Sequence, residues 1–151
     1  MLLTVAGVVA IMAVINAVMP AVGRTSGALV TSSSAVDERI SSQIEIIHAT
    51  GESGTSTVHI WVKNVGASTL APLDKIDMFF GPDGNFSRIS YGGASCSAPC
   101  WEYELENDTS WARGATLHIT VHWDETLQTG VTYYTKVVSP NGTYDSKLFT
   151  L

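Results

Sequence analysis

The chain has 151 residues, of which 45% are hydrophobic and 15% charged, and its formal net charge is −6 at pH 7. Its eight lysines and arginines are scattered without a run, so the sequence lacks the basic patch typical of nucleic-acid-binding proteins. It also lacks a phosphate loop, a nucleophile elbow and a defined carboxylate pair, and we therefore expect neither an enzyme nor a cofactor site.

The N-terminal stretch, residues 1–23, contains no charged side chain and has only Thr4 and Asn16 as polar ones. A helix of this length rises about 1.5 Å per residue and spans a bilayer core of about 30 Å. No basic residue precedes it, its apolar run exceeds the roughly 15 residues of a signal peptide, and no small-residue cleavage site follows. We therefore expect a retained helix that occupies the membrane before assembly.

The helical pattern continues to about residue 40 as a polar helix with a narrow apolar stripe, and Pro20 predicts a bend. One interpretation is a single-span anchor with a stalk. The other is a helix that assembles with copies of itself through its apolar side chains. These assembly candidates are Leu2, Leu3, Val5, Val8, Val9, Ile11, Met12, Val14, Ile15, Val18 and Met19.

At residue 41 the period of the pattern changes from 3.6 towards 2, which predicts that the helix leads directly into a strand. In residues 41–50 the alternation places Ile44, Ile46 and His48 on one face. Residues 57–64 alternate in the same way, with their valines and isoleucine pointing inward.

Further short strands are predicted between turn sequences, and no second helix is expected. They cover residues 75–80, 86–91, 101–106, 116–123, 131–138 and 143–151, the last two joined by a Ser-Pro-Asn-Gly hairpin turn. The predicted fold class is α+β: a helical segment over residues 1–40, then an immunoglobulin-like β-sandwich of seven or eight strands over residues 41–151.

The two cysteines, Cys96 and Cys100, are separated by three residues, a spacing that fits neither redox nor zinc motifs. A local disulfide in an oxidising, extracytoplasmic compartment is the favoured interpretation, and two free thiols are the alternative.

Polar clusters on the strands offer no metal site. His118 and His122 share a strand face but lie about 13 Å apart, too far to bind one ion, so we expect them to face solvent. His48 and His59 have no evident further partner. The acidic set Glu102, Glu104, Glu106 and Asp108 is expected to form a solvated face that discourages edge pairing.

Three asparagines, Asn85, Asn107 and Asn141, begin Asn-X-Ser/Thr sequons, and all three fall in predicted turns or at strand ends. Their placement predicts glycosylation of an exported domain.

These features together resemble the archaellins, the archaeal-type flagellins, and related archaellum proteins. The segments that carry the resemblance are residues 37–49 (DERISSQIEIIHA), 59–68 (HIWVKNVGAS), 79–89 (FFGPDGNFSRI) and 137–142 (VVSPNG). Val5 occupies the position where bacterial type IV pilins carry a glutamate, which favours archaellum-type assembly.

The resemblance implies a precursor that is cut by a prepilin-type peptidase and a homo-oligomeric helical filament at the cell surface. The first hypothesis for function is therefore the structural subunit of an archaellum-like motility filament. The alternative is a minor archaellum component or membrane-anchored adapter (stator) protein that binds the cell envelope.

Overall fold

A computed structural model of the chain describes residues 41–151. The predicted N-terminal helix, its bend at Pro20 and the apolar assembly residues lie outside the described residues. Within residues 41–151 no helix is long and apolar enough to cross a bilayer.

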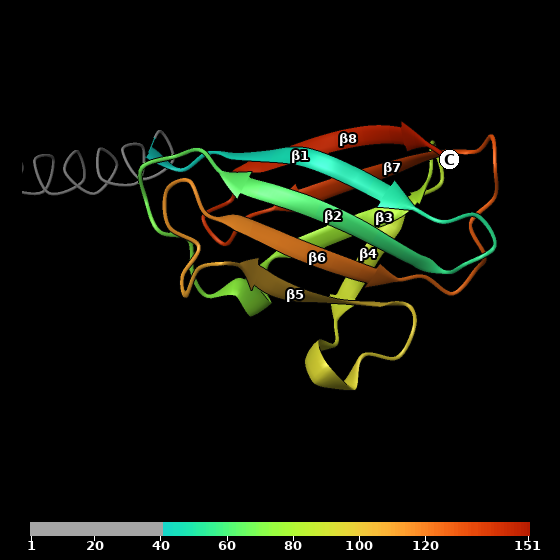
Figure 1. Cartoon of the computed structure of the whole chain (residues 1–151), viewed down its shortest axis with the longest axis horizontal. Coiled ribbons are helices and arrows are strands. Elements are labelled where there is room, and N and C mark those ends of the chain that lie inside the picture. The colour runs from blue at the N-terminus through green and yellow to red at the C-terminus, as the bar shows by residue number, and fades with distance from the viewer. Residues whose placement is uncertain (1–40) are drawn as a thin grey trace, which may run out of the picture. The chain divides into compact units, whose positions relative to one another are not determined.

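Eight strands and two short 3-10 helices make up this domain (Figure 1). They are β1 (Ile44–Gly51), β2 (Thr57–Asn64), η1 (Leu73–Lys75), β3 (Asp77–Pro82), β4 (Ser87–Tyr91), η2 (Gly93–Ser95), β5 (Cys100–Glu106), β6 (Thr116–His122), β7 (Thr132–Val138) and β8 (Tyr144–Thr150). Seven or eight strands were predicted, in this order. The bounds of β2 are those predicted, and the other strands differ by one to three residues at an end.

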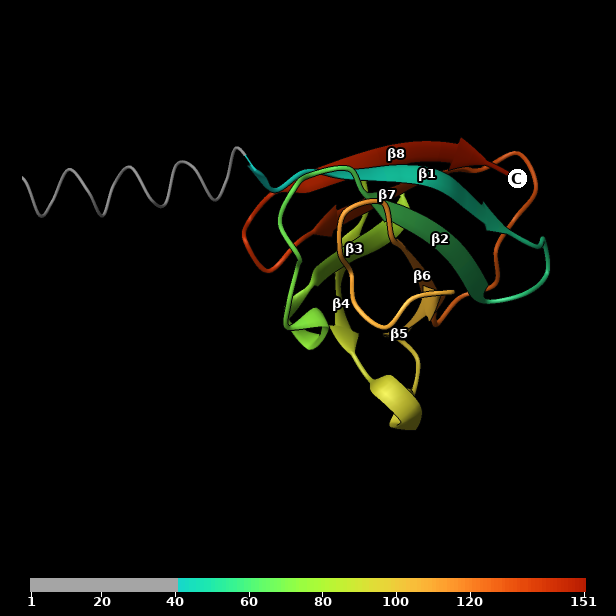
Figure 2. The ribbon, with the colours of Figure 1, turned by 60° about the vertical axis from the view of Figure 1, so that its left-hand side comes forward.

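The strands form one continuous sheet in the order β1-β2-β6-β5-β4-β3-β7-β8. All neighbours are antiparallel except β4 and β5, which run parallel through only two residue pairs. The sheet folds over on itself, so that the first and last strands, β1 and β8, lie side by side (Figures 1 and 2). The predicted sandwich is therefore observed as an eight-stranded sandwich that is nearly closed into a barrel.

The core lies between the two halves of this folded sheet and follows from the alternation of the strands. Every second residue of β2 and β6 is fully buried, and the large aromatic side chains Phe80, Trp101 and Trp111 fill the space between the layers. These buried aliphatic positions are Val58, Ile60, Val62, Leu117, Ile119 and Val121. The inward face predicted for residues 57–64 is thus confirmed.

One position of β1 does not follow the predicted alternation. The register of β1 against β2 shifts between Ile46 and His48, which is a β-bulge at Ile47. A bulge inserts one extra residue and reverses the facing of those that follow. The prediction that His48 shares a face with Ile44 and Ile46 is therefore wrong: His48 is exposed, and the next residue, Ala49, is buried instead.

The buried side chain of Asn64 holds the loop that follows β2, next to residues 41–43. Asn64 is fully buried, and its Nδ2 donates to the carbonyl oxygens of Ser68 and Trp111, both at 2.8 Å. Its Oδ1 accepts from the amide of Gly66 at 3.0 Å. The same loop binds the start of the domain, because the amide of Gly66 also donates to the carbonyl of Gln43 at 2.9 Å.

Candidate functional site

The outer face of β2, β6 and β5 carries a group of histidine, tryptophan and glutamate side chains, which we call the histidine face. Outward positions of a strand recur every second residue, and the antiparallel register brings those of the three strands level. The face is formed by His59 and Trp61 from β2, His118 and His122 from β6, and Glu102, Glu104 and Glu106 from β5.

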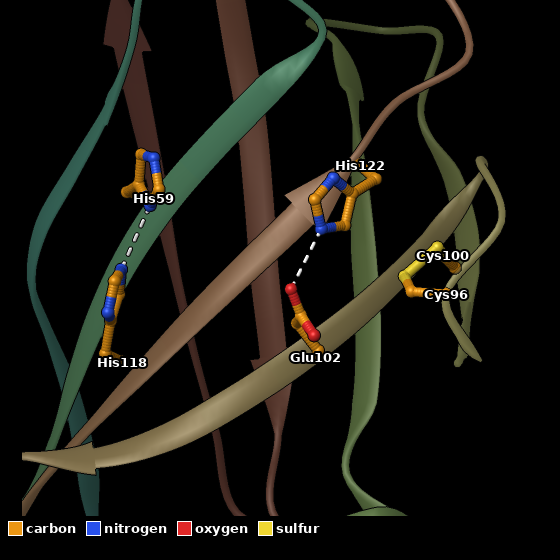
Figure 3. A network of polar contacts seen from close by, with 6 residues as sticks. All are labelled: His59, Cys96, Cys100, Glu102, His118 and His122. Atoms are coloured by element: carbon orange, nitrogen blue, oxygen red, sulfur yellow. Dashed lines mark hydrogen bonds and ion pairs between the residues drawn. A yellow bond between two sulfur atoms is a disulfide. The ribbon is translucent and has the colours of Figure 1, made fainter. Parts of the chain in front are cut away.

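Ring contacts on this face join β2 to β6. The rings of Trp61 and His118 are stacked, with centroids 4.6 Å apart and planes 1° apart. His59 lies diagonally across from His118, and its Nδ1 is 3.0 Å from His118 Nε2, a hydrogen-bonding distance (Figure 3). Two imidazole rings from different strands thus share one hydrogen bond, and one of them, His118, is stacked on the Trp61 indole.

Carboxylates of β5 complete the face. The Nε2 of His122 lies 3.0 Å from Glu102 Oε1 (Figure 3). The carboxylate of Glu106 accepts a hydrogen bond from the Trp61 indole at 3.3 Å and lies 3.7 Å from His118 Nδ1. Each of these two histidines therefore has a carboxylate beside one ring nitrogen.

Burial lowers the pKa of His59 below its usual value of 6.5, and the nearby His118 and His122 lower it further. Desolvation and positive neighbours both disfavour the imidazolium. His59 is therefore neutral at pH 7, and one of its ring nitrogens carries a free lone pair.

The sequence placed these histidines on the right surface but missed their partners. His118 and His122 do lie on the outer face, with side chains 20% and 35% exposed. Their partners, His59 and Glu102, come from neighbouring strands, and a spacing along one strand does not reveal them. The register between the strands was the missing information. A shift of one residue in that register would move these partner side chains to the opposite face of the sheet.

Part of the acidic set forms the solvated face that the sequence predicted, whereas Glu102 is half-buried beside His122. Glu104 and Glu106 are exposed. β4 pairs with β5 only at Cys100 and Trp101. The carboxylates therefore lie on the part of β5 whose edge is not paired with β4. Charged side chains at such an edge oppose pairing with another chain.

A second outer face, formed by β3, β7, β8 and the turn after β3, carries several exposed apolar side chains among polar ones, and the sequence analysis did not single it out. Phe86, Tyr144 and Leu148 are 45%, 63% and 53% exposed. The Phe86 ring lies 4.4 Å from that of Tyr134, and the ammonium group of Lys136 lies 4.2 Å from the Tyr144 ring centroid. Tyr144 and Leu148, which occupy outward positions of β8, could have indicated this face from the sequence.

The cysteine loop between β4 and β5 forms a third surface. Cys96 and Cys100 are joined by a disulfide, with their Cα atoms 5.6 Å apart. The loop is tightly folded, since a Cβ atom at Gly92 would lie 2.7 Å from the Cα atom of Cys96. Beside it, the Tyr91 and Tyr103 rings are stacked, and burial followed by the influence of Tyr91 raises the pKa of Tyr103.

The three sequon asparagines occupy different environments. Asn85 is exposed in the turn between β3 and β4, and Asn107 is exposed directly after β5. Asn141, in the turn between β7 and β8, is half-buried, and its Nδ2 donates to Ser42 Oγ at 3.0 Å. A glycan replaces only one of the two hydrogens on that nitrogen, but the half-buried position of the nitrogen limits a transferase's access to it.

Among the described residues, no three or more His, Cys, Asp or Glu side chains are grouped to hold a metal ion. The predicted assembly residues, Leu2 to Met19, lie outside the described part of the chain, as does any contact that they make.

Comparison with known proteins places the chain among proteins of the archaellum. Residues 1–147 match the sequence profile described as archaeal-type flagellin. An uncharacterised protein of Archaeoglobus fulgidus is 31% identical over 124 residues, which cover 80% of this chain and 75% of that protein.

Two solved structures resemble the domain at different levels of sequence identity. A chain of the archaellum periplasmic stator complex of FlaF and FlaG from Sulfolobus acidocaldarius is 30% identical, with a TM-score of 0.62, over 71% of this chain and 88% of that chain. The archaeal flagellum of Methanospirillum hungatei matches with a TM-score of 0.65 over 99% of this chain and 92% of its own, at 15% identity.

Proposed function

Because the chain belongs to the archaeal-type flagellin family and is a component of the archaellum, we propose that it is a stator-type subunit of that motility structure. In this proposal the apolar N-terminal segment anchors the subunit in the membrane. The domain of residues 41–151 extends outward and contacts the cell envelope. A prepilin-type peptidase processes the precursor.

The main support for this proposal is that the chain is more similar in sequence to the stator chain than to the flagellum subunit. The stator chain is 30% identical to this chain over 88% of its own length, whereas the flagellum subunit is 15% identical. At 15% identity the likeness supports a shared fold alone. An identity of 30% over most of the stator chain supports a closer relation than a shared fold.

The surface of the domain is consistent with a protein that holds neighbours of different kinds. The histidine face is polar and rich in carboxylates, whereas the face of β3, β7 and β8 presents exposed Phe86, Tyr144 and Leu148. An exposed apolar patch commonly marks a protein contact. Two chemically different faces fit a subunit placed between two unlike partners.

A second candidate is the filament subunit itself. The flagellum structure covers 99% of this chain, which includes the apolar residues 1–23. A helix that is apolar on every side is solvated only by lipid or by other apolar helices, and a bundle of identical helices would satisfy it. Small residues such as Gly7, Ala10 and Ala13 permit close helix approach.

Stoichiometry separates the two candidates. We would shear the surface filaments from cells, extract the remaining membranes with detergent, and quantify the chain in both fractions by mass spectrometry. The stator proposal expects the chain in the membrane extract, far below the copy number of the filament protein. A chain that dominates the sheared filaments would replace the stator proposal with the filament one.

The N-terminal segment is tested by Ala13→Asp. A charge near the middle of a membrane helix costs about 2.5–3.5 kcal/mol on insertion scales. The variant should therefore lose membrane anchoring and motility. Glu104→Gln, which changes an exposed carboxylate of β5, is the control and should swim normally. Normal swimming of the Ala13→Asp cells would contradict both candidates.

A further inference from the structure

The one pair of ring nitrogens within hydrogen-bonding distance on the histidine face comes from neighbouring strands. The Nδ1 of His59 on β2 and the Nε2 of His118 on β6 are 3.0 Å apart (Figure 3). The register sets this pair, because His59 lies opposite Thr120, two residues along β6 from His118. The pair therefore depends on the fold, not on the spacing of histidines in the sequence.

We propose that His59 Nδ1 and His118 Nε2 bind a divalent transition-metal ion, with water filling the remaining positions. Imidazole nitrogens bind such ions at about 2.0–2.1 Å. Two such ligands at a right angle are about 2.9 Å apart, and at a tetrahedral angle about 3.3–3.4 Å. The observed 3.0 Å is a hydrogen-bond length, and it shows that the two nitrogens are already close enough for one ion to reach both after a small rotation of the rings.

The surroundings of His118 select the nitrogen that binds. Its Nδ1 lies 3.7 Å from the Glu106 carboxylate, which favours a proton on Nδ1 and leaves the Nε2 lone pair for a ligand. A carboxylate beside the outer nitrogen of a metal-binding histidine is a common arrangement, since it fixes the tautomer and ring orientation. The stacked Trp61 ring further limits the orientation of His118.

In the metal-free protein the proton on His59 Nδ1 points at the lone pair of His118 Nε2, so the hydrogen bond must open before an ion can bind. On binding, both rings turn toward solvent so that their nitrogens converge on the ion, and the His59 proton moves from Nδ1 to Nε2. Space for this movement is present on both sides. A depression of about 450 Å³ is lined by Glu52, Thr55, Thr57 and His59, and one of about 280 Å³ by Glu102, Glu104 and His118, among others.

Neighbouring acidic groups favour a cation at this position. Glu104 lies directly opposite His118 in the register of β5 and β6, and Glu106 lies beside it. The described residues hold no ready cluster of three or more protein ligands. The site is therefore an open one with two protein ligands, and Cu²⁺, which stands highest in the affinity order of the divalent ions, should bind most tightly.

The test is a titration of the purified full chain in detergent with Cu²⁺ and Zn²⁺, followed by calorimetry and by Trp fluorescence. Copper should bind more tightly than zinc, with a one-to-one stoichiometry, and should quench Trp61 because that ring is stacked on a ligand. Electron paramagnetic resonance of the Cu²⁺ complex should show two nitrogen donors. His59→Gln and His118→Gln should each weaken copper binding at least tenfold.

The controls are His48→Gln and His122→Gln, which remove the remaining two of the chain's four histidines. Both should bind copper as the unmodified chain does, and thermal melts without metal should show that all four variants are folded. Absence of saturable copper binding would overturn the proposal. It would also be overturned if the His48→Gln variant lost as much affinity as His59→Gln, or if neither ligand variant lost any.

Discussion

The carboxylate of Asp145 on β8 accepts a hydrogen bond at 2.7 Å from the backbone amide of Ile46 on β1, and so joins the two edges of the sheet. Lys147, two residues further along β8, directs its ammonium group to the carbonyl oxygens of Ile46 and Ile47 at 3.5 and 3.3 Å. The bulge in β1 thus has its free backbone groups bound by side chains, in place of a strand ladder.

Asp145→Ala should therefore lower the free energy of unfolding by about 1.5–3 kcal/mol, the range for a hydrogen bond to a charged group. It should also expose the β1 edge and increase self-association on warming. Denaturant unfolding and light scattering measure the two effects. Glu45→Gln, at an exposed carboxylate of β1, serves as the control; equal stability of the two variants would show that the edges are held by other contacts.

A second prediction is a stabilising change in the core. Thr135 of β7 is fully buried, and its hydroxyl has no hydrogen-bond partner among the described residues. Thr135→Val removes the unsatisfied group and keeps the shape of the side chain, so the free energy of unfolding should rise by about 1 kcal/mol.

Thr132→Val on the same strand is the matched control, because the Thr132 hydroxyl does bond to that of Thr150 at 3.0 Å. It should give no increase in stability. A melting temperature for Thr135→Val below that of the unmodified chain would mean that the Thr135 hydroxyl has a partner in solution.

A third prediction concerns Asn64, which binds the loop that holds the start of the domain. Asn64→Ala leaves the amide of Gly66 and the carbonyls of Ser68 and Trp111 without this partner in a buried region. The Gly66 amide keeps its bond to the Gln43 carbonyl, and the Trp111 carbonyl keeps its bond from the Leu70 amide. The Ser68 carbonyl is left without its partner, so the loss of stability should be about 1–3 kcal/mol. Denaturant unfolding measures it.

The control for this change is Gln43→Ala, which removes an exposed amide side chain near the same loop and should alter stability by less than about 0.5 kcal/mol. Hydrogen exchange adds a local measurement. In Asn64→Ala the amides of Val65 and Gly66, which donate to the Gln43 carbonyl, should lose protection first. Unchanged exchange at these amides would contradict the assigned role.

The fold was predictable from the sequence where one local rule decided the outcome. The alternation of residues 57–64 and the Ser-Pro-Asn-Gly turn fixed β2 and the hairpin of β7 and β8. The bulge at Ile47 was not predictable, because Ile46, Ile47 and His48 are all compatible with a regular strand. The contacts that accompany it come from a distant strand, since Lys147 of β8 binds the carbonyl oxygens of Ile46 and Ile47.

The site was less predictable than the fold, for a physical reason. The histidine face depends on pairs across strands, and the sequence alone does not fix which residue of β2 lies opposite which residue of β6. The relevant histidine pair was therefore missed, since spacing along β6 considered only His118 and His122. Asn64 was likewise visible as the end of a strand but not as a buried group with three hydrogen bonds.

The last prediction concerns glycosylation, which remains untested. A transferase that acts on the folded domain reaches the exposed Asn85 and Asn107 directly. At Asn141 the acceptor nitrogen donates to Ser42 Oγ, a residue only 3% exposed. We therefore expect high glycan occupancy at Asn85 and Asn107 and lower occupancy at Asn141, measured by mass spectrometry of glycopeptides from the native protein.

The position of Asn85 gives its glycan a further consequence. It directly precedes Phe86, which lies on the second outer face against Tyr134, so a sugar chain there would cover part of that face. Asn85→Gln should increase self-association of the solubilised protein in sedimentation experiments, whereas Asn107→Gln, at the end of β5, should not. If Asn141 proves as fully occupied as Asn85, glycan transfer precedes folding of this turn, and the argument from the Ser42 hydrogen bond is wrong.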